Sequence, residues 1–307
     1  MELSRREALQ NIVSKCVPIA ATALALPAAE AAERTSQPAA PVGMLYDATL
    51  CIGCKACVVA CAEANELPRD VTRDGLHQAP EGLNAFTKNI IKLYKPQDHS
   101  PDSFVKQQCM HCFDPACVAA CPFEALWKDE RNGVVGWEPS RCIGCRYCEI
   151  ACPYHVPKFE WNAFNAKIVK CEFCRPRLEK GYEPACTSVC PTHAVIFGPR
   201  QDLLSQAKAR IEKSPDKYFE NRVYGEHEAG GTQVLYLSHV PFEEIGLPKL
   251  GTVAIPERLK WQKRIYKFLA LPLLLYAMLT SVMKNNWTEH QKEMREEEEK
   301  TGLKAQL

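Results

Sequence analysis

The pattern of apolar and polar residues in the middle of the chain predicts several short strands. The stretch LWKDERNGVVGW at 126–137 predicts a hairpin that turns near its Asn-Gly pair at 132–133. HAVIFG at 193–198 and GGTQVLYLSHV at 230–240 each have the composition of a strand. These strands are separated by long polar stretches, so we expect small sheets connected by loops.

Helices are predicted at three places in the same region. PRQDLLSQAKARIEKS at 199–214 predicts an amphipathic helix whose apolar face is formed by Leu203, Leu204, Ala207 and Ile211. The alanine-rich segments CVVACAEA at 57–64 and CVAACPFEAL at 117–126 predict two short helices. Helices and strands therefore mix without a regular alternation, which predicts an α+β fold.

The first 31 residues have the layout of a signal peptide. Two adjacent arginines, Arg5 and Arg6, precede a mostly apolar stretch at 16–26. This start resembles a twin-arginine export signal, and Ala29-Glu30-Ala31 fits an A-x-A cleavage site. An N-terminal amphipathic helix is the alternative, which the two prolines in this region disfavour because proline interrupts a helix.

Near the other end, the stretch at 265–283 carries one charge, Lys267, and predicts a transmembrane anchor. Its uncharged part, 268–283, would span about 24 Å as a helix, against a hydrocarbon core of about 30 Å. Lys267 and Lys284 could extend it by reaching outward to the membrane surface. A buried core helix is the alternative, but no other long apolar helix is predicted beside it. Residues 284–307 would then form a charged cytoplasmic tail.

Overall charge and composition exclude one function class and point to another. The formal net charge of the 307 residues is +1, so the basic surface of a nucleic-acid binder is missing. Much of the 46% hydrophobic content is cysteine and alanine, which makes the aliphatic core thin for this length. Bound metal could supply the missing cross-links.

The cysteines form four groups that repeat one pattern. The chain has 17 cysteines, and Cys16 lies in the predicted signal. Each group has a C-x-x-C pair, a third cysteine, and a fourth one soon after it. The groups are Cys51, Cys54, Cys57 and Cys61; Cys109, Cys112, Cys117 and Cys121; Cys142, Cys145, Cys148 and Cys152; and Cys171, Cys174, Cys186 and Cys190.

Three kinds of site compete for such groups: disulfides, zinc and iron-sulfur clusters. Structural zinc usually takes two well-separated cysteine pairs. Disulfides between cysteines so close in sequence would be strained. The run CIGCRYCEIACP at 142–153 instead has the bacterial ferredoxin spacing, in which three cysteines hold one 4Fe-4S cube and the fourth reaches a neighbouring cube. We therefore predict four 4Fe-4S clusters, with zinc as the main alternative.

Local spacing does not show which fourth cysteine serves which cube. In one arrangement, group one exchanges its fourth cysteine with group two, and group three with group four. In the other, nested arrangement, group two exchanges with group three, and group one with group four. The shorter loop between Cys121 and Cys142 favours the nested arrangement, since short loops close at a lower entropic cost. Lys55, Arg146 and Lys170 are candidates for raising cluster potentials, with plain surface charges as the alternative.

At this point the chain resembles the four-cluster ferredoxin-like iron-sulfur subunits of exported, membrane-bound oxidoreductases. The resemblance covers about residues 44–250. It rests on the cysteine arrangement and on GMLYDATLCIGC at 43–54, QCMHCFDPAC at 108–117, CRYCEIACPYHVPK at 145–158 and YGEHEAGGTQVLYL at 224–237. It implies two ferredoxin-like double-cluster modules, an inner one at about 105–160 inserted in the other.

The resemblance also implies how the cysteines are shared. One cube would take Cys51, Cys54, Cys57 and Cys190, and its neighbour Cys171, Cys174, Cys186 and Cys61. The inner module would hold one cube by Cys109, Cys112, Cys117 and Cys152, and the other by Cys142, Cys145, Cys148 and Cys121.

The implied function is electron relay without substrate chemistry, so no catalytic residue is predicted. A hydrogenase 2 type subunit would carry electrons from the small subunit of a nickel-iron hydrogenase to an integral membrane quinone-reactive subunit, on the periplasmic side. The iron-sulfur subunit of membrane-bound formate dehydrogenase, or of another molybdopterin oxidoreductase, is the alternative. The Arg5-Arg6 pair favours the hydrogenase, because the formate dehydrogenase subunit normally lacks its own export signal.

Overall fold

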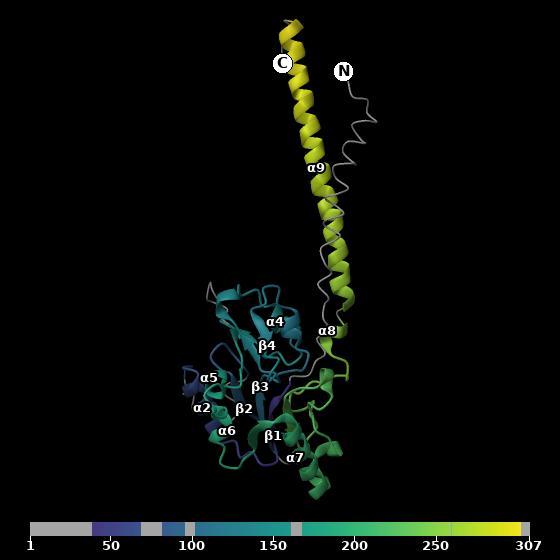
Figure 1. Ribbon diagram of the computed structural model, residues 1–307. Helices are drawn as coiled ribbons and strands as arrows, with labels where there is room; N and C mark the ends of the chain where they lie inside the picture. Colours follow the sequence, from purple (N-terminus) through teal and green to yellow (C-terminus); the bar gives the residue numbers. More distant parts are fainter. Residues whose placement is uncertain (1–38, 69–81, 96–101, 161–167, 259, 302–307) are drawn as a thin grey trace. The chain divides into compact units, whose positions relative to one another are not determined.

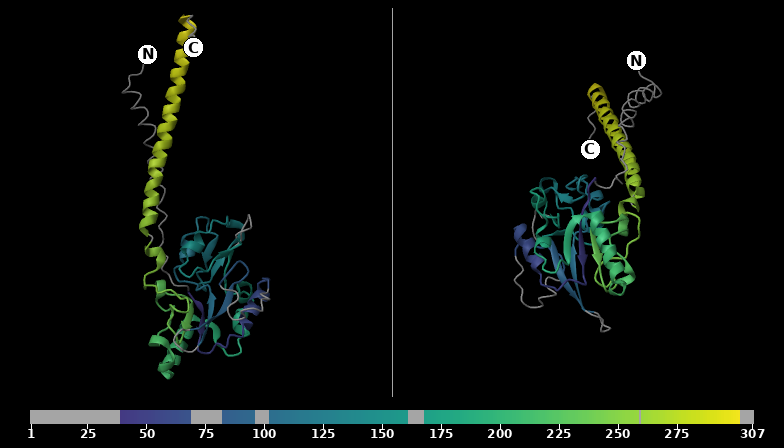
Figure 2. Two further views of the ribbon diagram at one scale, coloured as in Figure 1. Left: turned by 180° about the vertical axis from the view of Figure 1, so that it is seen from behind. Right: turned by 60° about the horizontal axis from the view of Figure 1, so that its bottom comes forward.

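The computed structural model describes residues 39–68, 82–95, 102–160, 168–258 and 260–301. The chain divides into two compact units, Met1–Ala254 and Ile255–Leu307. Figures 1 and 2 show the first unit as short strands and helices joined by long loops, which confirms the α+β prediction. The export signal predicted at 1–31 lies outside the described residues.

The largest sheet has three strands in the order β8-β1-β9. The central strand β1 (Val42–Asp47) is antiparallel to β8 (Val195–Pro199) and parallel to β9 (Val234–Leu237). The strands predicted at 193–198 and 230–240 are thus confirmed, the second with tighter bounds. The topology joins the strand before the first cysteine group to two strands that follow the fourth group.

Helix α7 (Arg200–Lys213) confirms the amphipathic helix predicted at 199–214. Its apolar residues Leu203, Leu204, Ala207 and Ile211 are all buried. They pack in one cluster with Leu45 of β1 and with Leu235 and Leu237 of β9, so the helix covers one face of this sheet. The other face is left for the parts of the chain that carry the cysteines.

The remaining strands of the described chain form three antiparallel pairs. These are β2 (Asn89–Tyr94) with β3 (Ser103–Gln108), β4 (Leu126–Lys128) with β5 (Val135–Trp137), and β6 (Lys158–Phe159) with β7 (Ile168–Val169). The β4–β5 pair confirms the hairpin predicted at 126–137, with Leu126 opposite Trp137. The β2–β3 pair was not predicted, and it proves to border the cysteine sites.

Short helices carry or follow many of the cysteines. They are α2 (Ala56–Ala64), α3 (Ala116–Ala119), α4 (Tyr147–Ala151), α5 (Arg175–Leu178) and α6 (Ala185–Ser188), with 3₁₀ turns at Pro139–Arg141, Pro215–Lys217, Phe219–Asn221 and Glu228–Gly230. Both predicted cysteine helices are confirmed. Helix α3 is shorter than predicted, because Pro122 lacks the N–H that would donate to the carbonyl of Val118.

The second unit consists of α8 (Ile255–Arg258) and α9 (Lys260–Thr301). Among the described residues, no helix has an apolar stretch long enough to cross a membrane. The transmembrane anchor predicted at 265–283 stays a prediction, because part of that segment lies outside the residues whose side chains the structure describes.

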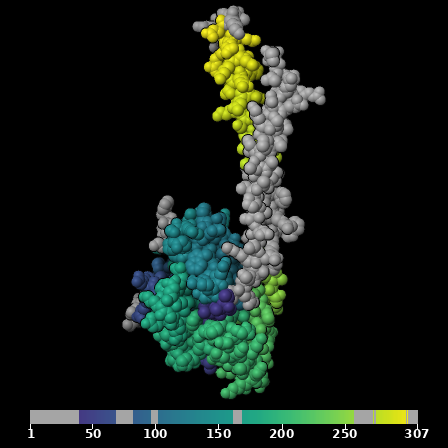
Figure 3. Space-filling view, in the orientation of Figure 1, coloured from purple at the N-terminus to yellow at the C-terminus, as the bar shows by residue number. Residues whose placement is uncertain are grey.

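Cysteine thiols and large side chains share the main core of the first unit. This buried cluster contains Tyr46, Phe173, Tyr236 and Phe242 together with Cys57, Cys109, Cys171 and Cys186. A smaller cluster contains Cys117 and Cys148 with Leu126, Val135, Phe159 and Ile168. Figure 3 shows the blue-teal atoms of the middle of the chain gathered on one side of this unit, and the green atoms of later residues on the other.

Candidate iron-sulfur sites

All sixteen cysteines of the four groups lie in the described part of the chain, and each is a free thiol. The disulfide alternative is therefore not realised in this structure. Most of these thiols are buried or half-buried, whereas Cys54 and Cys145 are exposed. The two exposed thiols occupy the same position in groups one and three.

The cysteine loops turn through left-handed backbone conformations at equivalent positions. In group one Gly53 has φ 68° and Lys55 has φ 55°, and in group three Gly144 has φ 72° and Arg146 has φ 65°. Glycine is needed at position 53 for a second reason, because a Cβ there would lie 2.3 Å from the ring of Phe104. Turns of this kind point successive N–H groups inward, which suits them to hold an anionic group.

Thiols from the two ends of the domain meet at the first site. Burial raises the pKa of Cys51, and the neighbouring Cys190 and Cys54 add to the rise. The pKa of Cys57 rises to about 11, again through burial first and then through Cys51, Cys190 and Cys54. Helix α2, which carries Cys57, packs against α6, which ends just before Cys190. The structure thus places the last cysteine of group four beside group one.

The second site joins the same two groups. Burial raises the pKa of Cys171 well above its ordinary value, and Cys61 and Cys186 contribute further. The pKa of Cys61 is raised by burial and by Cys174. Asn65, at the end of α2, lies over this site, with its Nδ2 atom 3.6 Å from the sulfur of Cys61 and 3.9 Å from that of Cys174.

The two inner groups face each other in the same way. Helices α3 and α4 pack together, and they carry Cys117 and Cys148. Burial raises the pKa of Cys112 well above its ordinary value. The nearby Cys152, and then Cys109 and Cys117, raise this pKa further. Burial raises the pKa of Cys148 to about 12, followed by the effects of Cys145, Cys142 and Cys121.

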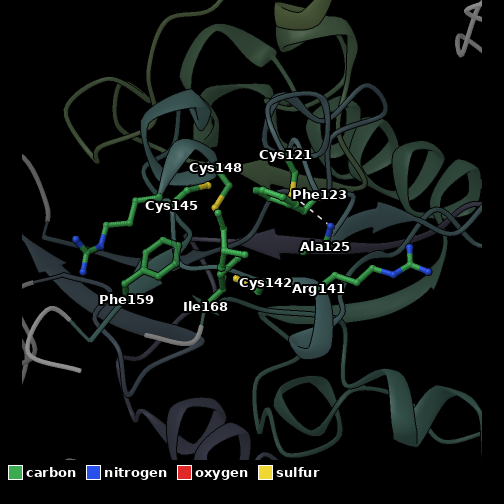
Figure 4. Close-up of a pocket in the computed structure, with 11 residues that line it drawn as sticks. Cys121, Phe123, Ala125, Arg141, Cys142, Cys145, Cys148, Phe159 and Ile168 are labelled. Carbon is green, nitrogen blue, oxygen red and sulfur yellow. Dashed lines mark hydrogen bonds between the residues drawn. The ribbon is translucent and has the colours of Figure 1, made fainter. Parts of the chain in front are cut away.

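A small cavity separates the thiols of the last set. In Figure 4 the labelled cysteine sulfurs lie around one central space. The cavity is lined by Cys121, Cys142, Cys145 and Cys148, with Phe123, Ala125, Ile143, Phe159, Ile168 and two arginines. The backbone N–H of Ala125 donates to the sulfur of Cys121 over 3.3 Å. Apolar walls and an N–H directed at sulfur are features that tune iron-sulfur clusters.

The residues fit a 4Fe-4S cube better than a bare ion. Among the described residues, no three His, Cys, Asp or Glu side chains are grouped closely enough to hold a single metal ion. Four thiols instead line the cavity between Cys121, Cys142, Cys145 and Cys148. The raised pKa values of the thiols reflect crowded, buried sulfurs, which a cationic iron core would stabilise as thiolates.

Two buried lysines and a half-buried one add positive charge near these thiols. Lys170, which the sequence marked as a candidate, is 2% exposed and donates to the carbonyl oxygens of Val135 and Cys171. Lys128 donates to the carbonyl oxygen of Cys112 over 2.7 Å, and burial lowers its pKa to about 8. A third lysine, Lys106, is 1% exposed in β3. The sequence analysis missed Lys128 and Lys106. Only Lys128 lies in a predicted strand, where a lysine is a usable signal.

Repeated ferredoxin-type cysteine loops define the class of ferredoxin-like iron-sulfur proteins. Two family models described as "4Fe-4S dicluster domain" match residues 43–122 and 102–200. The chain belongs to the 4Fe-4S dicluster ferredoxin family of iron-sulfur subunits.

Its relatives include subunits of two kinds of complex. The chain is 40% identical over 296 residues to the Hydrogenase-2 operon protein HybA of Escherichia coli O157:H7, covering 85% of this chain and 90% of HybA. It is 36% identical over 217 residues to the nitrate-inducible formate dehydrogenase iron-sulfur subunit of Escherichia coli K12, covering 68% of this chain and 73% of that subunit. A formate dehydrogenase iron-sulfur subunit of Haemophilus influenzae is 33% identical over 241 residues, covering 76% and 75%.

Proposed function

We propose that this chain is the electron-transfer iron-sulfur subunit of a hydrogenase of the hydrogenase 2 type. The observation that carries the proposal is the similarity to HybA over 85% of the chain, which includes all four cysteine groups. The subunit would pass single electrons between partner subunits and would have no substrate of its own. Its cofactors are four 4Fe-4S clusters.

In this proposal each cluster is held by three cysteines of one group and the fourth of another. The outer pair uses Cys190 with group one and Cys61 with group four, and the inner pair uses Cys152 with group two and Cys121 with group three. The packing of α2 on α6 and of α3 on α4 supports this exchange. Pairing of β1 with β8 and β9 supports nested modules, because it closes the outer groups around the inner ones.

The protein's part in electron transfer is to hold the clusters and to set their potentials. A bound 4Fe-4S cluster supplies a one-electron carrier whose potential depends on local charge, hydrogen bonds to sulfur and solvent exposure. The chain controls these through the apolar walls around Cys121 and Cys148, the N–H groups that face sulfur, and the buried lysines.

We further propose that the subunit acts on the periplasmic side of the cytoplasmic membrane. Arg5 and Arg6 support export by the twin-arginine route, which carries folded proteins and so allows clusters to be inserted beforehand. The partners would be a nickel-iron hydrogenase small subunit and an integral membrane quinone-reactive subunit. Replacing both arginines with lysine should retain the protein in the cytoplasm, and unchanged export in cell fractionation would reject the route.

Metal analysis of anaerobically purified full-length protein tests the cofactor. We expect brown protein with broad absorbance near about 400 nm and about sixteen irons, with matching acid-labile sulfide. Zinc in stoichiometric amount, without labile sulfide, would overturn the proposal. Electron paramagnetic resonance of the reduced protein then shows whether the iron is present as 4Fe-4S clusters.

A subunit of a formate dehydrogenase is the second candidate, because the chain is 36% identical to such a subunit over 68% of its length. The two candidates differ in the catalytic partner. Capture of the tagged chain from detergent-solubilised membranes should bring down a nickel-containing partner in the first case and a molybdenum or tungsten protein in the second. Hydrogen oxidation and formate oxidation by the captured complex separate the same alternatives.

A further inference from the structure

Lys106 is a charged residue in the interior of the outer module. It lies in β3 opposite Ile91 of β2, and its side chain is 1% exposed. Its carbonyl oxygen accepts a hydrogen bond from the hydroxyl of Tyr236 over 2.7 Å, which fixes the backbone at this position. A lysine is rarely buried so completely, because removing its charge from water carries a large energetic cost.

Side-chain alternation directs Lys106 toward the cysteine loops. Residues two apart in a strand share a face, so Lys106 is on the same face as Phe104. The ring of Phe104 occupies the space beside Gly53, inside the loop of group one. The face of β3 that carries Lys106 is therefore the one that borders the first site.

The groups that act electrostatically on this ammonium are thiols of both outer sites. Burial by itself would lower the pKa of Lys106, but Cys186, Cys57, Cys61 and Cys171 together raise it above the ordinary value. The effect is reciprocal, since Lys106 opposes the rise in pKa of Cys57, Cys61 and Cys186. Cys57 belongs to the proposed first site and the other three to the second.

Lys106 also differs from the buried Lys170 and the half-buried Lys128 in its hydrogen bonds. Lys170 and Lys128 donate to backbone carbonyl oxygens. The Nζ atom of Lys106 has no hydrogen-bond partner among the described residues, although it is buried. A buried ammonium needs a compensating negative charge, and the sulfur ligands of the two outer sites are the groups that face it.

We propose that Lys106 is a potential-setting residue shared by the two outer clusters. This inference rests on the proposed function. A cluster gains one negative charge when it accepts an electron, and a fixed ammonium beside its sulfur ligands favours that reduced state. One residue thereby keeps two neighbouring carriers reducible together, which suits them to exchange electrons with each other.

The test compares Lys106→Met with the wild-type full-length protein in an anaerobic redox titration followed by electron paramagnetic resonance. Methionine keeps an unbranched chain of similar size and removes the charge. At a fixed potential, the ratio of reduced to oxidised cluster should fall about tenfold for two of the four clusters, equivalent to ~59 mV for one electron. The other two clusters should titrate as in the wild type.

Two further variants separate charge from packing. Lys92→Met removes a lysine from the adjacent strand, opposite Val105 and on the other face, and should leave all four potentials unchanged. Lys106→Arg keeps the charge and should keep the wild-type potentials. If Lys106→Met protein loses iron, wild-type iron content and wild-type potentials in Lys106→Arg protein would support the proposal. Loss of iron in both variants would show that the side chain has a steric role and would overturn the proposal.

The outcomes also distinguish this inference from the proposed function. Wild-type protein without iron and labile sulfide would reject the clusters themselves. Wild-type protein with four clusters, together with Lys106→Met protein whose four potentials are unchanged, would reject only the role of Lys106.

Discussion

The exchange of cysteines between groups one and four can be tested by counting iron in single and double variants. The perturbation is alanine at Cys51, at Cys190, and at both. Cys190 raises the pKa of both Cys51 and Cys57, so the structure places it beside group one although it is distant in sequence. If Cys51 and Cys190 hold the same cluster, removing the second ligand damages a site that has already been lost.

The expected magnitude follows from this sharing. Each single variant should lose up to one cluster, about four of about sixteen irons. The Cys51→Ala/Cys190→Ala variant should lose no more than the larger single loss. The Cys142→Ala/Cys190→Ala variant should lose the sum of its two single losses, because Cys142 lies in the set with Cys121. This is the logic of a double-mutant cycle, with iron as the measured quantity.

Iron and labile sulfide are measured on anaerobically purified protein, and paramagnetic resonance counts the clusters that remain. Pairing of the groups in chain order would give the reverse result, since Cys190 would then serve the cluster of group three. Additive losses in the Cys51/Cys190 pair, combined with no additional loss in the Cys142/Cys190 pair, would refute the nested arrangement. Unchanged resonance signals from the other clusters control for general unfolding.

Three other predictions concern the fold around the sites. Asp47 is fully buried and accepts a hydrogen bond from Arg210 over 2.9 Å. The Asp47→Asn substitution should therefore lower the free energy of unfolding by about 2 kcal/mol. The melting temperature should fall by about 4–8 °C, whereas the exposed Glu220→Gln control should shift it little; equal shifts would contradict this assignment. Gly53→Ala should lose about four irons through its clash with the β3 phenylalanine, and Gly82→Ala, with open space around it, should lose none. Iron removal by a chelator should reduce protection of β1 in hydrogen exchange, and unaltered protection would show that the core forms without metal.

The sequence was most informative where chemistry depends on local spacing. The four cysteine groups, the hairpin at 126–137 and helix α7 were all predicted from nearby residues. Local patterns succeeded there because turn residues and helical periodicity act within about 15 residues. The nested pairing of the groups was favoured by the short loop between Cys121 and Cys142 and implied by the resemblance, and it stays a prediction until the ligands are tested.

Features that depend on distant parts of the chain were missed. Lys106 has one apolar and one polar neighbour in strand β3, so the local pattern does not mark it as buried. Lys106 is buried because β2 and the cysteine loops, which are distant in sequence, cover it. The parallel pairing of β1 with β9 joins residues nearly two hundred positions apart, such as Met44 and Val234. The transmembrane anchor predicted at 265–283 rests on a local apolar run and stays a prediction.

The raised pKa values of the buried thiols connect cluster binding to folding. Burial places the pKa of Cys148 and Cys186 at about 12, so without metal both would be neutral thiols at physiological pH. Iron must therefore displace protons from the core as it binds, and its affinity for thiolates contributes directly to the stability of the folded state. The cysteines also occupy positions in the main core that aliphatic side chains would fill in an ordinary domain. Cluster binding and folding are therefore coupled, which is a physical reason to expect the clusters to be inserted before the proposed export.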